Sequence, residues 1–260
     1  EERGTFLLLH GEPSWAYLYK DWIGPLVADG YRVVAPDHLG FGRSDKPTDD
    51  DWYTIARHRE ALARLIEGLD LDRIHLVVQD WAGPIGLMNA VADRDRYARL
   101  FILNTWLHAD DHEYSEGVQW WRQAAIDPEQ LGGDMPTGVI VAGTTRRPDV
   151  DKDLLVRAFD APFPDAAAKA GARRFPFCIP FAEPELGDGA LQAEARAALP
   201  TWNIPKHVAF GDADPIFTWE WAEQWAAELG ATLDRIEGAS HFVQVEAPDD
   251  CLAVIRSHLP

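Results

Sequence analysis

The chain has 260 residues, enough to bury a sizeable core in one α/β domain, and its formal net charge is -19. This acidity, without any Lys/Arg-rich stretch to neutralise phosphates, argues against a nucleic-acid partner. No apolar run reaches the length of a membrane span and no signal peptide is visible, so we expect a cytoplasmic protein without a membrane partner.

Strand-like and helix-like segments alternate along the first hundred residues. Short apolar or β-branched runs predict strands, and apolar residues on one helical face predict helices. The expected strands are 5–10, 31–35, 74–79 and 100–104, and the expected helices are 14–28, 54–69 and 81–92. The continuous apolar run 74–79 is typical of a central parallel strand covered on both faces. The alternation predicts right-handed βαβ units, and hence an α/β fold with a mostly parallel sheet flanked by helices.

The pattern changes after Trp106. Residues 107–200 lack apolar strand runs and consist of helix-like pieces broken by Pro and Gly. We expect this segment to be an inserted helical cap domain over the C-terminal ends of the strands, with 1–106 and 201–260 forming the main domain. After the insertion the alternation resumes, with expected strands at 207–211 and 232–236 and expected helices at 218–229 and from 248 onward.

The two cysteines, Cys178 and Cys251, lie among apolar neighbours and far apart in the chain. This setting favours buried free thiols over a disulfide framework or a metal site.

Asp80 stands where the central strand breaks into a helix. Residues 76–83 read Leu-Val-Val-Gln-Asp-Trp-Ala-Gly, an apolar run followed by a small-residue helix start. This is the context in which α/β-hydrolases display a Ser, Cys or Asp nucleophile. A carboxylate that attacks carbon leaves an alkyl ester that water can still hydrolyse, so Asp suits displacement at a saturated carbon. Taken alone, an Asp at such a boundary is more often a helix N-cap.

Two further residues complete the chain order nucleophile, acid, histidine. Asp214 follows the first strand after the insertion, and His241 lies beyond the last strand. A carboxylate nucleophile needs a base that activates water for a second step, and the base needs an acid that orients it. Asp212 competes for the acid role, but Asp214 is preferred because the loop must leave the strand before it turns toward the histidine.

An early turn adds a fourth element. Residues 10–13 read His-Gly-Glu-Pro and follow the first expected strand. Such a turn supplies a backbone N–H for an oxyanion hole, here from Glu12, facing the N–H of Trp81. Taken alone, the motif is more simply interpreted as an ordinary turn without a catalytic role.

These motifs resemble those of the haloalkane dehalogenases, a family of the α/β-hydrolase fold. The specific part of the resemblance is the Gln-Asp-Trp elbow together with the His-Gly-Glu-Pro turn. The resemblance is greatest to the subfamily with an Asp-His-Asp triad and two halide-binding tryptophans. The matching stretches span nearly the whole chain and lie at 10–15, 40–47, 77–81, 161–165 and 241–244.

The resemblance implies catalytic roles for three residues and a pair of backbone groups. Asp80 would be the nucleophile, His241 the base and Asp214 the acid that orients the base. The backbone N–H groups of Glu12 and Trp81 would form the oxyanion hole.

The resemblance also implies how the halide is bound. Trp81 would supply one indole N–H, and the cap would supply the second from Trp121, with the neighbouring Trp120 as the alternative. Sister subfamilies bind halide with an Asn at the position of Glu12. An ionised Glu12 cannot bind a halide ion, so the second halide ligand must be another tryptophan.

The implied reaction converts a small apolar haloalkane into an alcohol, a halide ion and a proton through an alkyl-enzyme ester. It needs no metal and no organic cofactor. We expect a dry aromatic pocket under the cap and a monomeric protein.

Two alternatives stay open. An epoxide hydrolase uses the same Asp–His chemistry but protonates the epoxide oxygen with two cap tyrosines, and this cap holds only Tyr114. A hydrolase-like binding protein without catalytic activity would be expected to have lost a member of the triad, and none is lost here.

The start of the chain departs from the family pattern. The family's sheet begins with a hairpin before the strand that leads into His10, and residues 1–4 are too few to form one. We therefore expect the hairpin to be missing and the start to be truncated, which leaves a lost N-terminal signal open.

Overall fold

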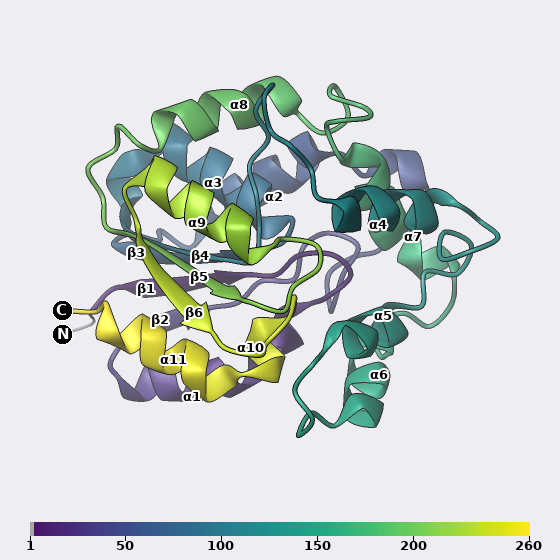
Figure 1. Ribbon diagram of the computed structural model, residues 1–260, viewed down its shortest axis with the longest axis horizontal. Helices are drawn as coiled ribbons and strands as arrows, with labels where there is room; N and C mark the ends of the chain where they lie inside the picture. The colour runs from purple at the N-terminus through teal and green to yellow at the C-terminus, as the bar shows by residue number, and fades with distance from the viewer. Residues whose placement is uncertain (1–2) are drawn as a thin grey trace.

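A single sheet of six strands runs through the protein, for which a computed structural model describes residues 3–260 (Figure 1). The strands are β1 (Thr5–Leu9), β2 (Arg32–Val34), β3 (Ile74–Gln79), β4 (Tyr97–Leu103), β5 (Lys206–Gly211) and β6 (Thr232–Ile236). Their order across the sheet is β2-β1-β3-β4-β5-β6, and all neighbouring pairs are parallel. The predicted α/β fold with a parallel sheet is therefore confirmed.

Helices cover both faces of the sheet (Figure 1). One face carries α2 (Ile55–Gly68), α3 (Ala82–Ala92), α8 (Gly189–Ala198) and α9 (Trp219–Leu229). The other carries α1 (Lys20–Ala28) and α11 (Pro248–Ser257), with the short α10 (Val243–Glu246) just before α11. Because both faces are covered, β3 is buried along its whole length, as expected for a central parallel strand.

Local signals in the sequence explain where these helices begin and end. The side chain of Thr54 accepts a hydrogen bond from the Arg57 N–H at the start of α2, and Thr218 does the same for α9. Gly230, at φ 60, ends α9 in the left-handed conformation that glycine adopts without strain. In α2 the buried residues Ile55, Leu62 and Ile66 form the face that packs on the core.

The segment between β4 and β5 is helical. It contains α4 (Glu116–Ile126), α5 (Thr137–Thr144), α6 (Lys152–Asp160), α7 (Ala170–Arg174) and α8. Helices α4 to α7 lie beyond the C-terminal ends of the strands, with α5 and α6 paired as a hairpin (Figure 1). Helix α8 instead runs alongside α3 in the layer that flanks the sheet. The division of the chain into a main domain and a cap at 107–200 stays a prediction.

Some boundaries differ from those expected. Strand β4 begins at Tyr97, three residues before the predicted start, because a short 3-10 turn at Arg94–Arg96 leads the chain directly into the sheet. The predicted helix 14–28 is a 3-10 turn, Ala16–Tyr19, followed by α1. Both cysteines are buried and free, as predicted. Within residues 3–260, every helix is too short or too polar to cross a lipid bilayer.

Candidate active site

Asp80 sits at the sharp turn between β3 and α3. Its φ of 53° lies in the left-handed region, a strained conformation that an α/β-hydrolase elbow imposes on the residue it presents. The Asp80 N–H donates to the Asn104 carbonyl at 2.9 Å, and the Gly83 N–H donates to the Asp80 carbonyl at 2.8 Å. A Cβ on Gly83 would lie 1.9 Å from Thr105 Oγ1, so the turn requires glycine there. The backbone of Asp80 is consequently held by hydrogen bonds from both its N–H and its carbonyl group.

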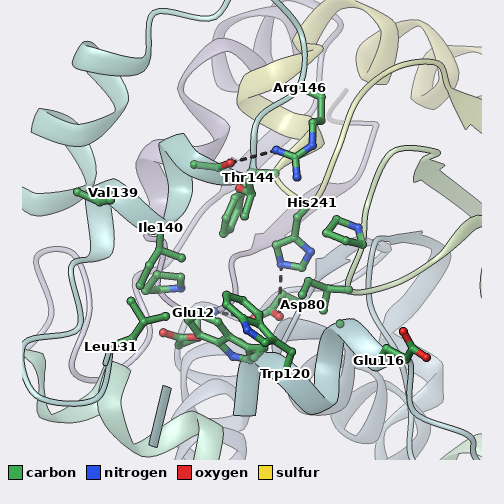
Figure 2. A pocket seen from close by; sticks show the side chains of 17 residues that line it. Glu12, Asp80, Glu116, Trp120, Leu131, Val139, Ile140, Thr144, Arg146 and His241 are labelled. Carbon is green, nitrogen blue, oxygen red and sulfur yellow. Dashed lines mark hydrogen bonds and ion pairs between the residues drawn. The ribbon is translucent and has the colours of Figure 1, made fainter. Parts of the chain in front are cut away.

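The Asp80 carboxylate has two polar neighbours from other parts of the chain. The Glu12 N–H donates to its Oδ1 at 2.7 Å. His241 Nε2 lies 3.5 Å from its Oδ2 (Figure 2). No hydrogen bond from the Trp81 N–H to this carboxylate is found among residues 3–260. One of the two predicted oxyanion-hole donors therefore already contacts the predicted nucleophile.

Asp214 and His241 form a buried pair. His241 Nδ1 lies 2.9 Å from Asp214 Oδ2, and Asn104 Nδ2 donates to the same oxygen at 2.8 Å. The other oxygen, Oδ1, accepts from the Ile216 N–H at 2.8 Å. Asp212, the competing acid, instead accepts a hydrogen bond from the Gly238 N–H and does not contact the histidine. The geometry therefore favours Asp214 for the acid role.

Burial and neighbouring charges together raise the pKa values of two groups in this cluster. Burial lowers the pKa of His241, but the carboxylates of Asp214 and Asp80 outweigh it and raise the pKa to about 10. Burial, and then the charge of Asp80, raise the pKa of Glu12 well above its usual range. Glu12 Oε1 is fully covered and has no hydrogen-bond partner within the described part of the chain. The resting site thus favours an imidazolium held between two carboxylates, and it disfavours the ionised form of Glu12.

Three polar residues around this cluster were missed by the sequence-based predictions. Gln79 Nε2 lies 3.1 Å from both the Nε2 and the carbonyl oxygen of His241. Asn104 joins Asp214 to Gly211, whose N–H donates to Asn104 Oδ1 at 3.0 Å. Glu246 accepts a hydrogen bond from Ser240, the residue before His241. Gln79 and Asn104 each lie at the C-terminal end of a central strand, a signal that could have revealed them.

A cavity of about 600 Å³ opens onto Asp80 and His241. Its wall is largely apolar and comes mainly from α4, α5 and the segment between them (Figure 2). The lining side chains include Glu12, Trp120, Trp121, Leu131, Val139, Ile140, Thr144, Arg146 and Ile216. Such a space suits an apolar ligand whose reacting atom is placed against a few polar groups.

The tryptophans predicted to bind halide occupy different settings. Trp121 and Trp120 both line the cavity; Trp121 is half-buried, whereas Trp120 is 60% exposed. Trp81 is buried, with its ring against Trp106 and Phe175, and it is not among the residues that line the cavity. Which indoles bind halide stays a prediction. Among residues 3–260, no cluster of three His, Cys, Asp or Glu residues could hold a metal ion.

Known proteins share both the sequence and the fold. A family profile for the α/β-hydrolase fold matches residues 4–248. A haloalkane dehalogenase from Psychrobacter cryohalolentis is 40% identical, over 81% of this chain and 67% of the relative. Haloalkane dehalogenase 1 from Mycobacterium bovis is 41% identical, over 93% of this chain and 79% of the relative. The structure of a tetrameric haloalkane dehalogenase from Paraglaciecola agarilytica superposes with a TM-score of 0.89 at 33% identity, covering 99% of this chain and 84% of that one.

Proposed function

Because the chain belongs to the haloalkane dehalogenase family of the α/β-hydrolase fold, we infer that it hydrolyses carbon–halogen bonds. The products are an alcohol, a halide ion and a proton. The observation that carries this function at the level of residues is the elbow aspartate, Asp80. Its carboxylate lies between the Glu12 N–H and the His241 imidazole and faces an apolar cavity.

In the first proposed step, Asp80 attacks the carbon that bears the halogen. The Glu12 N–H holds Oδ1, which leaves Oδ2 as the attacking atom. An O–C bond forms, the carbon–halogen bond breaks, and the halide leaves with the bonding electron pair. We propose that the indole N–H groups of Trp81 and Trp121 stabilise the charge that develops on the halogen. The product is a neutral alkyl ester of Asp80.

In the second proposed step, water hydrolyses this ester. His241 takes a proton from the water while the oxygen attacks the ester carbonyl carbon. The N–H groups of Glu12 and Trp81 stabilise the resulting oxyanion at Oδ1. Collapse of the intermediate breaks the acyl–oxygen bond, and the alkoxide receives the proton from His241. The carboxylic acid formed at Asp80 then gives up the second proton of the water, which restores the carboxylate. Asp214 keeps the imidazole oriented through its 2.9 Å contact with Nδ1.

The cavity supports a small apolar substrate, since most of its lining side chains are apolar. We further propose that the protein acts as a monomer in the cytoplasm, without nucleic acid, membrane or cofactor. Light scattering of the purified protein tests the monomer, because a solved relative is tetrameric.

The epoxide hydrolase alternative is not favoured. Its chemistry needs cap tyrosines whose hydroxyls reach the substrate. The Tyr114 hydroxyl instead lies 3.0 Å from His108 Nδ1, and Tyr114 is not among the residues that line the cavity.

The direct test measures bromide and proton release from 1,2-dibromoethane. The wild type should release both, and Asp80→Asn should release neither. In His241→Gln, which cannot take a proton from water, the first step should still occur, and mass spectrometry should show an alkyl adduct on Asp80. The double variant Asp80→Asn/His241→Gln is the control and should remain unmodified. Absence of bromide release from folded wild-type protein would contradict the proposed function.

A further inference from the structure

Glu246 is a buried carboxylate outside the proposed catalytic triad, at the C-terminal end of α10. It is 4% exposed and accepts three backbone hydrogen bonds. The Ser240 N–H donates to its Oε2 at 2.7 Å. The Arg147 N–H donates to its Oε1 at 2.6 Å, and the Arg146 N–H donates to the same oxygen. Both oxygens of one carboxylate are thereby used, each by a different part of the chain.

The two parts of the chain that meet at Glu246 each carry a piece of the site. Ser240 directly precedes His241, so its N–H belongs to the loop that presents the imidazole. Arg146 and Arg147 follow α5 in the helical segment between β4 and β5, and Arg146 lines the cavity. Figure 2 shows Arg146 and Thr144 on the side of the cavity where His241 lies.

A second contact joins the same two parts at their outer edge. Arg147 Nη2 donates to the Glu237 carbonyl at 2.8 Å and pairs with Asp250 of α11. The Asp250 side chain is 53% exposed, so solvent screens this ion pair and its contribution is small. The buried Glu246 carboxylate is therefore the principal link, because hydrogen bonds to a charged, desolvated acceptor are the stronger kind.

We propose that Glu246 is a positioning residue for ester hydrolysis and that it fixes the position of the His241 loop relative to the cavity wall. This inference rests on the proposed function, in which only the second step uses His241 as a base. Glu246 touches neither substrate nor the reacting atoms, so it acts through the loop that carries His241. Loss of the link should impair hydrolysis while the attack by Asp80 continues, because the Glu12 N–H still holds the Asp80 carboxylate.

Glu246→Gln is the primary variant. Its side chain keeps the shape but has one accepting oxygen, and its amide N–H groups would face a backbone N–H that needs an acceptor. Either the Ser240 contact or the contact with Arg146 and Arg147 must then be lost. A displacement of about 1 Å in a reacting group costs on the order of 10²-fold in rate, which is the expected loss in hydrolysis.

Asp212→Asn is the matched control. Asp212 also accepts a backbone hydrogen bond from the loop that leads to His241, from the Gly238 N–H at 2.7 Å. It contacts neither Arg146 nor Arg147, so its replacement should leave both steps at the wild-type rate. Glu246→Asp is the second variant. It keeps the charge but is one methylene shorter, and should show a selective loss of hydrolysis even where Glu246→Gln does not fold.

The assay separates the two steps by rapid mixing with 1,2-dibromoethane. For Glu246→Gln we expect a bromide burst equal to the enzyme concentration at the wild-type rate, followed by turnover slowed about 10²-fold. Mass spectrometry should show the alkyl adduct on Asp80 accumulating. Equal slowing of both steps, or a wild-type hydrolysis rate in a folded Glu246 variant, would overturn the inference. Failure of the wild type to release bromide would instead refute the proposed function.

Discussion

Replacing Gly11 with alanine should displace the nucleophile by a measurable amount. A Cβ on Gly11 would lie 2.3 Å from Asp80 Oδ1 and 2.4 Å from Asp80 Cβ. An ordinary contact to a Cβ begins near 3.4 Å, so the turn and the carboxylate must separate by about 1 Å. The same movement lengthens the 2.7 Å bond from the Glu12 N–H to Oδ1. A misplacement of this size costs roughly 10²-fold in rate, equivalent to about 2.7 kcal/mol in the activation barrier.

The assay for Gly11→Ala is bromide release under saturating substrate, with thermal unfolding followed on the same samples. Gly68→Ala is the control. Gly68 lies at the end of α2, where an added Cβ would meet no atom within 4 Å. This control should keep wild-type activity and gain about 0.5–1 kcal/mol of stability, as alanine is the better helix former. A folded Gly11→Ala protein with wild-type turnover would refute the close approach of the turn to Asp80.

Two further predictions concern the halide and the base. Trp121→Phe removes an indole donor and should weaken bromide binding by about 1.5–3 kcal/mol, measured by quenching of tryptophan fluorescence. If bromide affinity falls in Trp120→Phe and not in Trp121→Phe, Trp120 is the halide ligand instead. The pKa of His241, followed by NMR, should be about 10 in the wild type and lower in Asp80→Asn, which removes one of the charges that raise it. Since this folded-state pKa lies above the usual 6.5, the stability that the imidazolium provides is complete below pH 6.5 and is lost as the pH rises toward 10. An unchanged His241 pKa in Asp80→Asn would contradict the coupling.

The sequence was sufficient to predict the sheet and to place the three main side chains of the site together. The continuous apolar run at 74–79 coincides with β3. A strand buried on both faces is apolar along its whole length, so the ends of the apolar run mark the ends of the strand. Asp80, Asp214 and His241 each follow a strand, and parallel strands place their C-terminal ends at one edge of the sheet. The contacts of 2.9 Å and 3.5 Å around His241 follow from that shared edge.

The position of Gln79 and Asn104 at strand ends marks them as candidates, but the contacts of the polar residues around the proposed triad could not be predicted in this way, because those contacts depend on strand order. Asn104 ends up between Asp80 and Asp214 because β4 lies between β3 and β5, an order fixed by packing across the sheet. In the sequence Glu246 looks like an ordinary helical residue. Its three donors come from the loop just before α10 and from a segment about 100 residues earlier in the chain. The setting of Trp81 depends on ring packing with Trp106 and Phe175, which chain spacing does not encode.

The charges around His241 set the order of the two proposed steps. While Asp80 is ionised, its carboxylate and that of Asp214 hold the imidazole in its protonated form, which cannot accept a proton from water. Ester formation converts Asp80 into a neutral group, while the Asp214 carboxylate stays in contact with the ring. The pKa of His241 must then fall, because one of the interactions that raised it has disappeared while burial still opposes the charge. The first step therefore shifts the imidazole toward the neutral form, which releases its proton to solvent and is the form that the second step needs as a base.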